Sequence, residues 1–280
     1  MTLLATYFVH TLFIRNMSCL VLGLLSGIAL FGRCPARFGS LGCEGNPTLS
    51  PTVSFDHHLE GTEGRQPTEP GSDTITFQQL SHKVPNKARH ELEKAEQARS
   101  TNRAEEAISH FNKAVAIDPE YVAARNNLGS LYLILNRADE GIAQLEEAAK
   151  IDPHEPAVFA NLAVGYAMLS KFEDSERAAR TLISLDRTGV RGPTLLGFAL
   201  VKQRKFTDEA LHYLDRAKAQ YPPAYLLAAK VFQEKADLER AQLELRTYLT
   251  TGEQRFREFA ESWLRLLSKG EQETAALLPR

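Results

Sequence analysis

The chain has 280 residues, of which 43% are hydrophobic and 24% charged, and its formal net charge at pH 7 is −2. This composition is typical of a folded globular protein and excludes a chain that is disordered throughout. Because basic and acidic residues are mixed evenly outside the N-terminal region, no basic stripe emerges, and we expect no nucleic-acid partner.

The first 34 residues differ from the rest by two apolar runs. Residues 3–14 are almost wholly apolar, and residues 17–32 are apolar again behind Arg15. The second run has the length of a signal-peptide hydrophobic region and is short for a spanning helix, which needs roughly 20 residues. The run before Arg15 is abnormal for a signal, so translation from Met17 and an uncleaved anchor stay open, as does a cytosolic chain. We interpret residues 1–34 as a signal peptide or N-terminal membrane anchor, and we expect an exported protein of the periplasm or cell envelope.

Residues 35–85 are predicted to be a disordered tether. Prolines 47, 51, 67 and 70 interrupt this stretch, and it has few large apolar residues to offset its chain entropy. Thr74 to Phe77 alternates polar and apolar residues, which indicates a short strand or an extended segment. All three cysteines precede residue 44, so the remainder of the chain needs no disulfide.

A 34-residue pattern recurs through the rest of the chain and is clearest in residues 122–155. Small residues at positions 8 and 20 of this unit let two helices approach closely, and larger ones at positions 7, 11 and 24 fill the space between them. Asn136 and Arg137 mark the turn, and Pro153 ends the second helix, because proline fits a first turn but not a helix interior. The pattern residues are Leu128, Gly129, Tyr132, Ala138, Gly141, Leu145 and Ala148.

This spacing resembles the tetratricopeptide repeat, a helix-turn-helix unit of 34 residues. Ala163, Tyr166 and Gly197 take the corresponding structural positions in the next two units. The fourth unit carries one extra residue, and Lys94 stands in the first where leucine is usual. The expected repeats are residues 88–121, 122–155, 156–189, 190–222 and 223–252, followed by a capping helix at 253–268 and a polar tail at 269–280.

The resemblance therefore implies an all-α fold, a right-handed helical solenoid over residues 86–268. Five hairpins and one cap predict eleven helices (two times five plus one) with almost no strand.

No stretch of the sequence carries a catalytic or metal-binding signature. The HExxH, GxSxG, Walker-type and CxxC motifs are absent, and the eight histidines make no pair at ligand spacing on one helix. The adjacent His57 and His58 lack further ligands, and the adjacent Glu146 and Glu147 fit the solvated face of a helix better than an acid/base pair. We expect a protein that is not an enzyme and that has no catalytic residues, cofactor or metal.

The resemblance implies a groove as the binding site. In the tetratricopeptide family, positions 2, 5, 6, 9, 12 and 13 of each first helix line a concave face. The residues predicted to line a peptide-binding groove here are Asn126, Asn127, Ser130, Leu133, Ile134, Asn161, Val164, Met168 and Phe198. This largely apolar lining suits an extended peptide or a partner helix. An alternative is that the tether or a second copy covers part of the face, so self-association stays open.

Asn127 and Asn161 both take position 6 of their units and should lie about one repeat apart. A side-chain amide offers one acceptor and two donors, enough to pair with a peptide backbone. This resembles the asparagine ladders by which some tetratricopeptide proteins hold a peptide. The alternative is that each amide bonds the backbone of a neighbouring helix. The family's carboxylate clamp wants lysine and asparagine where Leu92 and Glu96 stand, so a chaperone-tail receptor is not expected.

These observations favour a protein–protein interaction scaffold of the cell envelope, with a protein or peptide partner. The alternative function is an accessory or regulatory subunit of an envelope enzyme or of a secretion or assembly machine.

Overall fold

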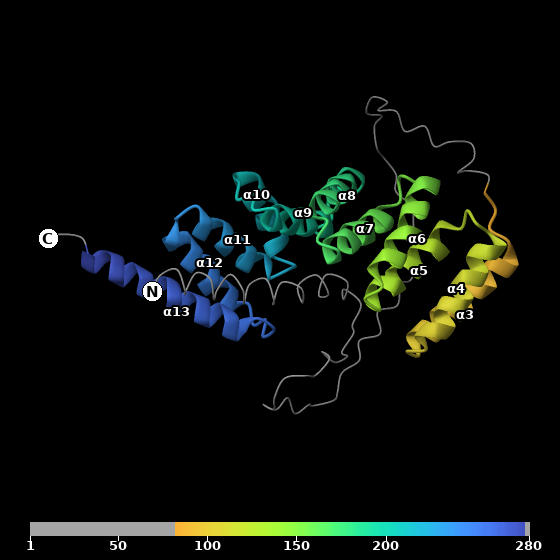
Figure 1. The fold of residues 1–280 in the computed structure, drawn as a ribbon, viewed down its shortest axis with the longest axis horizontal. Helices are drawn as coiled ribbons and strands as arrows, with labels where there is room; N and C mark the ends of the chain where they lie inside the picture. The colour runs from red at the N-terminus through yellow and green to blue at the C-terminus, as the bar shows by residue number, and fades with distance from the viewer. Residues whose placement is uncertain (1–81, 278–280) are drawn as a thin grey trace, which may run out of the picture. The chain divides into compact units, whose positions relative to one another are not determined.

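The computed structural model describes residues 82–277 (Figure 1). The signal peptide or anchor, most of the tether and the extended segment predicted within residues 1–81 lie outside the described residues, as do residues 278–280.

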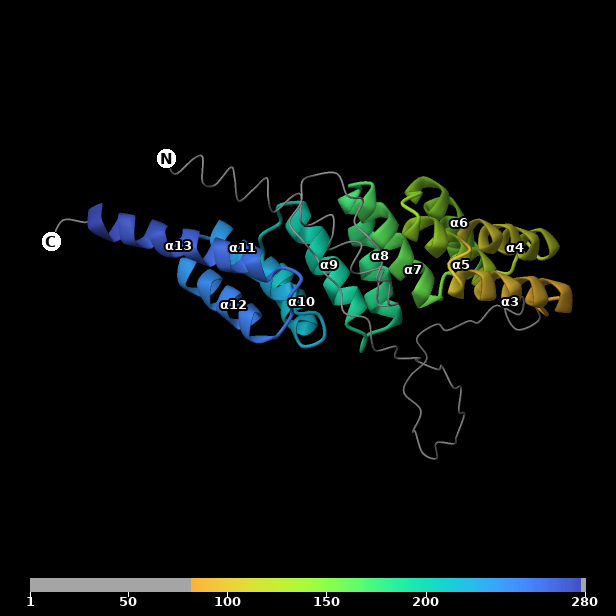
Figure 2. The same cartoon turned by 90° about the horizontal axis from the view of Figure 1, so that it is seen from below.

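Eleven helices and no strand make up residues 82–277, which confirms the predicted all-α solenoid. The helices are α3 (Asn86–Ser100), α4 (Ala104–Ile117), α5 (Val122–Ile134), α6 (Ala138–Ile151), α7 (Pro156–Met168), α8 (Phe172–Leu185), α9 (Arg191–Lys202), α10 (Asp208–Lys218), α11 (Ala224–Glu234), α12 (Leu238–Thr250) and α13 (Arg257–Leu277). Each odd-numbered helix from α3 to α11 packs on the helix that follows it, and each hairpin contacts the next. Figures 1 and 2 show the hairpins succeeding one another in chain order, from α3 and α4 at one end to α13 at the other.

The turn inside each hairpin has one residue in the left-handed backbone region. These residues are Asn102, Asn136, Ser170, Arg204 and Ala236, with φ between 58° and 61° and with successive intervals of 34, 34, 34 and 32 residues. In the second hairpin the Asn136 N–H donates to Leu133 O at 3.0 Å, and the Arg137 N–H donates to Tyr132 O at 2.8 Å. This pair of bonds is the Schellman motif, which satisfies carbonyls at a helix end. All five hairpins therefore end their first helix in the same way.

The extra residue of the fourth unit lies in its turn. The helix α10 begins four residues after Arg204, whereas α6 begins two residues after Asn136, so the turn is longer by the extra residue and by one further residue that α10 leaves out of its first turn. The added length places Thr207 at the N-cap of α10, where its side chain accepts a hydrogen bond from the Ala210 N–H. The insertion is thus absorbed outside the helices, and it leaves the packing of α9 on α10 in place.

Close backbone approach holds the two helices of the second hairpin together. A Cβ atom added to Gly129 would lie 2.6 Å from Leu145 Cγ and 2.9 Å from Gly141 O, which is closer than real Cβ contacts allow. In the third hairpin a hydrogen bond joins the two helices at this place. The buried Ser175 hydroxyl donates to Ala163 O at 2.7 Å.

The contact between hairpins uses other positions of the first helix. A Cβ atom added to Gly192, at position 3 of the fourth unit, would lie 2.7 Å from Ile183 Cγ1 of the preceding hairpin. Ala124 and Val158 take position 3 in the second and third units and are fully buried, whereas His90 takes it in α3 and is exposed. The helix α3 therefore presents a polar edge, as expected for a helix that begins an array. Lys94, at position 7 of the first unit, is half-buried, and its ammonium pairs with Glu91 at 2.8 Å.

The last helix is longer than predicted. The helix α13 runs to Leu277, through most of the segment that we expected to be a polar tail from residue 269. Phe256, just before α13, and Ala260, Trp263 and Leu267 within it are buried at helical spacing and form one stripe, as expected for a cap. The stripe fixes where the cap packs, but it does not determine where the helix ends.

We predict that Gly129→Leu lowers the free energy of unfolding by about 1–3 kcal/mol, because the side chain must displace Leu145 and the backbone of α6. Urea denaturation followed by circular dichroism measures the change. The matched control is Ala143→Leu on the exposed side of α6, which should leave the unfolding free energy within about 0.5 kcal/mol. An unchanged value for Gly129→Leu would contradict the packing role of position 8.

We also predict that Ala236→Gly stabilises the protein. A left-handed conformation costs a residue with a Cβ atom about 1–2 kcal/mol, and glycine removes this cost. Glycine also has more conformational freedom in the unfolded chain, which offsets part of the gain. The expected net increase in the free energy of unfolding is about 0.5–1 kcal/mol. Asn136→Gly should gain less in the same measurement, since asparagine tolerates this conformation. A destabilised Ala236→Gly variant would show that the turn in the fifth hairpin is not strained.

Candidate peptide-binding site

Side chains from the first helices of four successive hairpins form one chain of hydrogen bonds. Arg191 Nη2 donates to Asn161 Oδ1 at 3.0 Å, and Asn161 Nδ2 donates to Asn126 Oδ1 at 2.9 Å. Asn126 Nδ2 then donates to Asn127 Oδ1 at 3.3 Å, and Asn127 Nδ2 donates to Glu96 Oε1 at 2.8 Å. We call these five residues the polar ladder. It runs from α9 through α7 and α5 to α3.

The two ends of the polar ladder fix its direction. A guanidinium group only donates hydrogen bonds and a carboxylate only accepts them, so Arg191 must face the amide oxygen of Asn161, and Glu96 must face the amide nitrogen of Asn127. The orientation of Asn126 between them then follows, because its oxygen accepts from Asn161 and its nitrogen donates to Asn127. All donors therefore point from the cation toward the carboxylate. Hydrogen bonds aligned in this way polarise and strengthen one another.

The three amides keep unused hydrogen-bonding capacity. Each uses one of its two amide hydrogens and one of its two oxygen lone pairs within the polar ladder, and none makes another hydrogen bond within residues 82–277. Asn126 and Asn127 are half-buried, whereas Asn161 is only 6% exposed. The partners of the three amides are side chains and not the helix backbone that the alternative named, and Asn126 and Asn127 still present free donors and acceptors.

The structure divides the remaining predicted groove residues into two sets. Ser130, Ile134 and Met168 are half-buried and lie on the same helices as the amides. Leu133, Val164 and Phe198 are at most 1% exposed and differ from the accessible lining that we predicted.

Two contacts explain the burial of Leu133 and Phe198. Leu133 Cδ2 fills the space beside two glycines, because a Cβ atom added to Gly141 or Gly165 would lie 2.9 or 3.1 Å from it. The Phe198 ring packs edge to face against Phe172, with ring centroids 6.4 Å apart. Both residues therefore hold helices together.

The residues predicted to take structural positions of the repeat pack against neighbouring helices. Tyr132 and Ala163 are buried, and a Cβ atom added to Gly197 would lie 2.6 Å from Leu214 Cδ2 of α10. Tyr166 is half-buried, and its hydroxyl donates to Glu146 Oε1 at 2.8 Å. Burial, together with this carboxylate, raises the pKa of Tyr166 above its usual value.

Sequence reasoning missed Arg191 and Glu96 as partners of the asparagines. Both take positions that line the groove in the resembling family, position 2 of the fourth unit and position 9 of the first. Their charge at those positions was the available signal. Lys202, at position 13 of the fourth unit, is half-buried and has its ammonium 5.4 Å from the centroid of the Phe172 ring. Burial lowers the pKa of Lys202.

Two further kinds of feature are absent from residues 82–277. None of the helices described there is both long and apolar enough to cross a membrane. The same residues contain no group of three or more His, Cys, Asp and Glu side chains that could hold a metal ion.

Comparison with known proteins identifies the repeat. Residues 98–164 match the family model of the tetratricopeptide repeat. The crystal structure of MamA is similar, with a TM-score of 0.55 and 16% identity over 62% of this chain and 94% of that chain. A search of curated proteins finds no match.

Two further solved structures share the fold. YrrB, described as a tetratricopeptide repeat protein with an unusual peptide-binding site, has a TM-score of 0.55 and 19% identity over 65% of this chain and 92% of that chain. PilF of Pseudomonas aeruginosa has a TM-score of 0.54 and 20% identity over 64% of this chain and 83% of that chain. At these identities the likeness concerns the fold alone. The matched sequence shows tetratricopeptide repeats in residues 98–164, and the five equivalent hairpins have the fold of tetratricopeptide repeat proteins.

Proposed function

We propose that the protein is a non-enzymatic scaffold that binds an extended peptide or a partner helix on the face carrying the polar ladder. The observation that carries this proposal is the unused donor and acceptor capacity of Asn126 and Asn127, which are half-buried on α5. Amides whose orientation is already fixed lose little entropy when they bind a peptide backbone. The half-buried Ser130, Ile134 and Met168 add polar and apolar contacts of the kind that an extended peptide or amphipathic helix uses.

An accessory or regulatory subunit of an envelope enzyme or assembly machine is the second candidate function. It would use the same face with one fixed partner, whereas a scaffold would hold several. Co-purification from a native membrane fraction distinguishes the two. One protein recovered at a constant ratio supports the subunit, and a varied set supports the scaffold.

The binding proposal predicts that Asn127→Ala and Asn161→Ala weaken binding of a peptide selected on the full chain from a phage-displayed library. Losing one hydrogen bond costs about 0.5–1.5 kcal/mol, so each variant should raise the dissociation constant about two- to thirteen-fold in fluorescence anisotropy. The matched control is Asn112→Ala, at an exposed position of α4, which should leave it unchanged.

Thermal unfolding of the same variants separates binding from folding. Asn161 is nearly buried and has two partners in the polar ladder, so Asn161→Ala should also lose some stability, and Asn127→Ala is the cleaner probe of binding. Lower stability with unchanged affinity in both variants would assign the polar ladder to folding alone and would count against the proposed function.

We also propose that the protein is exported to the cell envelope. The support is the apolar run of residues 17–32 behind Arg15. We predict that mass spectrometry of the protein from its natural host finds either a chain cleaved after this run or a full-length chain in the membrane fraction. Full-length protein in the soluble cytosolic fraction would contradict both forms of the proposal.

A further inference from the structure

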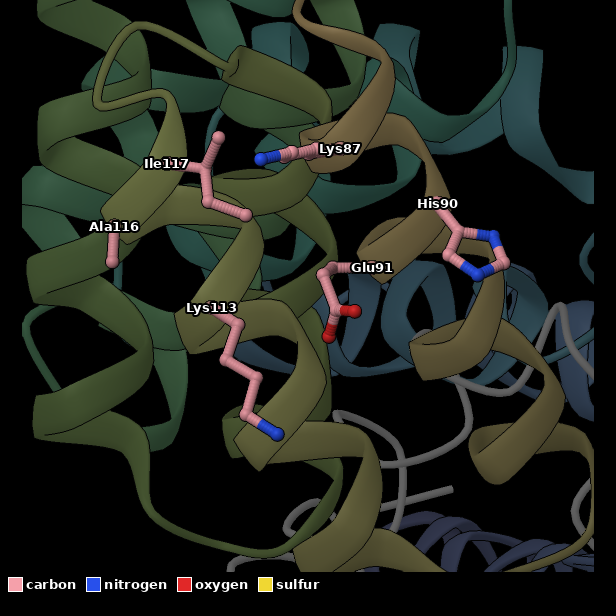
Figure 3. A pocket seen from close by; sticks show the side chains of 6 residues that line it. All are labelled: Lys87, His90, Glu91, Lys113, Ala116 and Ile117. Atoms are coloured by element: carbon pink, nitrogen blue, oxygen red, sulfur yellow. The ribbon is translucent and has the colours of Figure 1, made fainter.

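A cavity of about 380 Å³ lies between α3 and α4, at the start of the array (Figure 3). Its lining residues are Lys87, His90, Glu91, Lys113, Ala116 and Ile117. The volume is within the range of about 300–1,000 Å³ that is usual for ligand pockets. No residue of the polar ladder lines this cavity, so it is a separate site.

The one carboxylate in the cavity is already neutralised. Glu91 Oε1 lies 2.8 Å from Lys94 Nζ, and Glu91 Oε2 lies 2.7 Å from His110 Nδ1. Hydrogen bonds from Lys94 and then His110 lower the pKa of Glu91 to about 2. Both carboxylate oxygens of Glu91 thus have a partner outside the cavity lining, and neither forms an ion pair with Lys87 or Lys113.

Two ammonium groups of the cavity have no such partner. Lys87 and Lys113 are exposed, and neither forms an ion pair with a carboxylate within residues 82–277. Figure 3 shows them on opposite sides of Glu91, with Lys87 on α3 and Lys113 on α4. Many other cations of the described helices, such as Lys94 and Lys150, do have a carboxylate partner. The cavity therefore carries uncompensated positive charge.

An apolar wall stands beside these charges. Ile117 is 41% exposed, and Leu243 and Leu266 are the other exposed large hydrophobic residues of the described chain. The neighbouring Ala116 is exposed as well. An exposed apolar side chain within a cavity, rather than alone on a flat surface, is the arrangement expected of a binding site.

The place of the cavity in the array explains why it is open. Later hairpins bury position 3 of their first helix against the preceding hairpin, as Ala124 and Val158 show. In α3 this position holds the exposed His90, and no described helix precedes α3. The same polar edge that begins the array thus leaves the cavity accessible to another molecule.

We propose that this cavity binds an acidic segment of a partner protein in which an apolar side chain lies beside one or two carboxylates. The carboxylates pair with Lys87 and Lys113, and the apolar side chain contacts Ile117 and Ala116. Charge complementarity selects the sign of the partner, since a basic segment would meet two ammonium groups without compensation. The site does not depend on peptide binding at the polar ladder.

The test uses the full chain and a fluorescein-labelled peptide carrying Asp-Leu-Asp between Gly-Ser flanks, with binding followed by fluorescence anisotropy. We expect it to bind more tightly than peptides carrying Lys-Leu-Lys or Asp-Ser-Asp in the same flanks. Lys87→Glu and Lys113→Glu should each raise its dissociation constant about three- to tenfold. Ile117→Ser should raise it by a similar factor. Binding should weaken as salt increases from about 0.1 M to about 1 M, where the Debye length falls from about 10 to about 3 Å.

Two matched variants control for charge and for apolar area. Lys171→Glu reverses an exposed lysine away from the cavity, and Leu243→Ser removes the exposed leucine of α12. Both should leave the dissociation constant unchanged, and circular dichroism checks that every variant is folded. No binding to the unmodified chain, equal binding of the basic peptide, or an equal effect of Lys171→Glu would overturn the proposal. A dimer in sedimentation velocity that Lys113→Glu dissociates would identify a second copy as the occupant and would overturn it too.

Discussion

The close approach of the two helices within each hairpin is the constraint on which the rest of this structure depends. At Gly129 and Gly141 the backbones of α5 and α6 come so near that neither position has room for a Cβ atom. In the third hairpin Ser175 occupies the position of Gly141 and uses its hydroxyl to bond the carbonyl of Ala163. Because the second, third and fourth hairpins are closed by such contacts and all five by their own Schellman turn, neighbouring hairpins stack as similar units. That stacking brings the first helices side by side, and only then can their side chains form the polar ladder.

The two candidate binding surfaces differ in whether their charged groups have hydrogen-bonding or ion-pair partners within the protein. Along the polar ladder, the charges of Arg191 and Glu96 are joined through three amides, so the surface offers directed hydrogen bonds. At the start of the array, Lys87 and Lys113 meet no carboxylate of the described chain, so the cavity offers charge next to an apolar wall. The first surface suits a backbone of any sequence, whereas the second discriminates by the sign of the charge. A protein with both could hold two segments of one partner, or two partners, without competition between them.

The 34-residue spacing of small and large residues was sufficient to predict the five hairpins and the helix that follows them. It sufficed because the period of the sequence directly encodes where two helices touch, as Gly129 and Leu145 illustrate. It could not give the partners of Asn126 and Asn161, since those depend on how one hairpin superposes on the next. The burial of Leu133 has the same origin, because glycines of its own and the next hairpin leave the space that it fills. The extension of α13 to Leu277 was missed because polar residues carry no packing signal that marks a helix end.

The polar ladder also constrains how many repeats this protein can have. Its three amides belong to two hairpins, and its charged ends belong to the hairpins on either side. If a unit were duplicated or lost within α3–α9 during evolution, the donor of one hairpin would face a side chain of the wrong type in the next. The helices after α9 contribute nothing to the polar ladder, so this part of the array can lengthen or shorten by whole repeats without disturbing it. The polar ladder thus restricts the number of repeats among the first four units and places no restriction on the fifth.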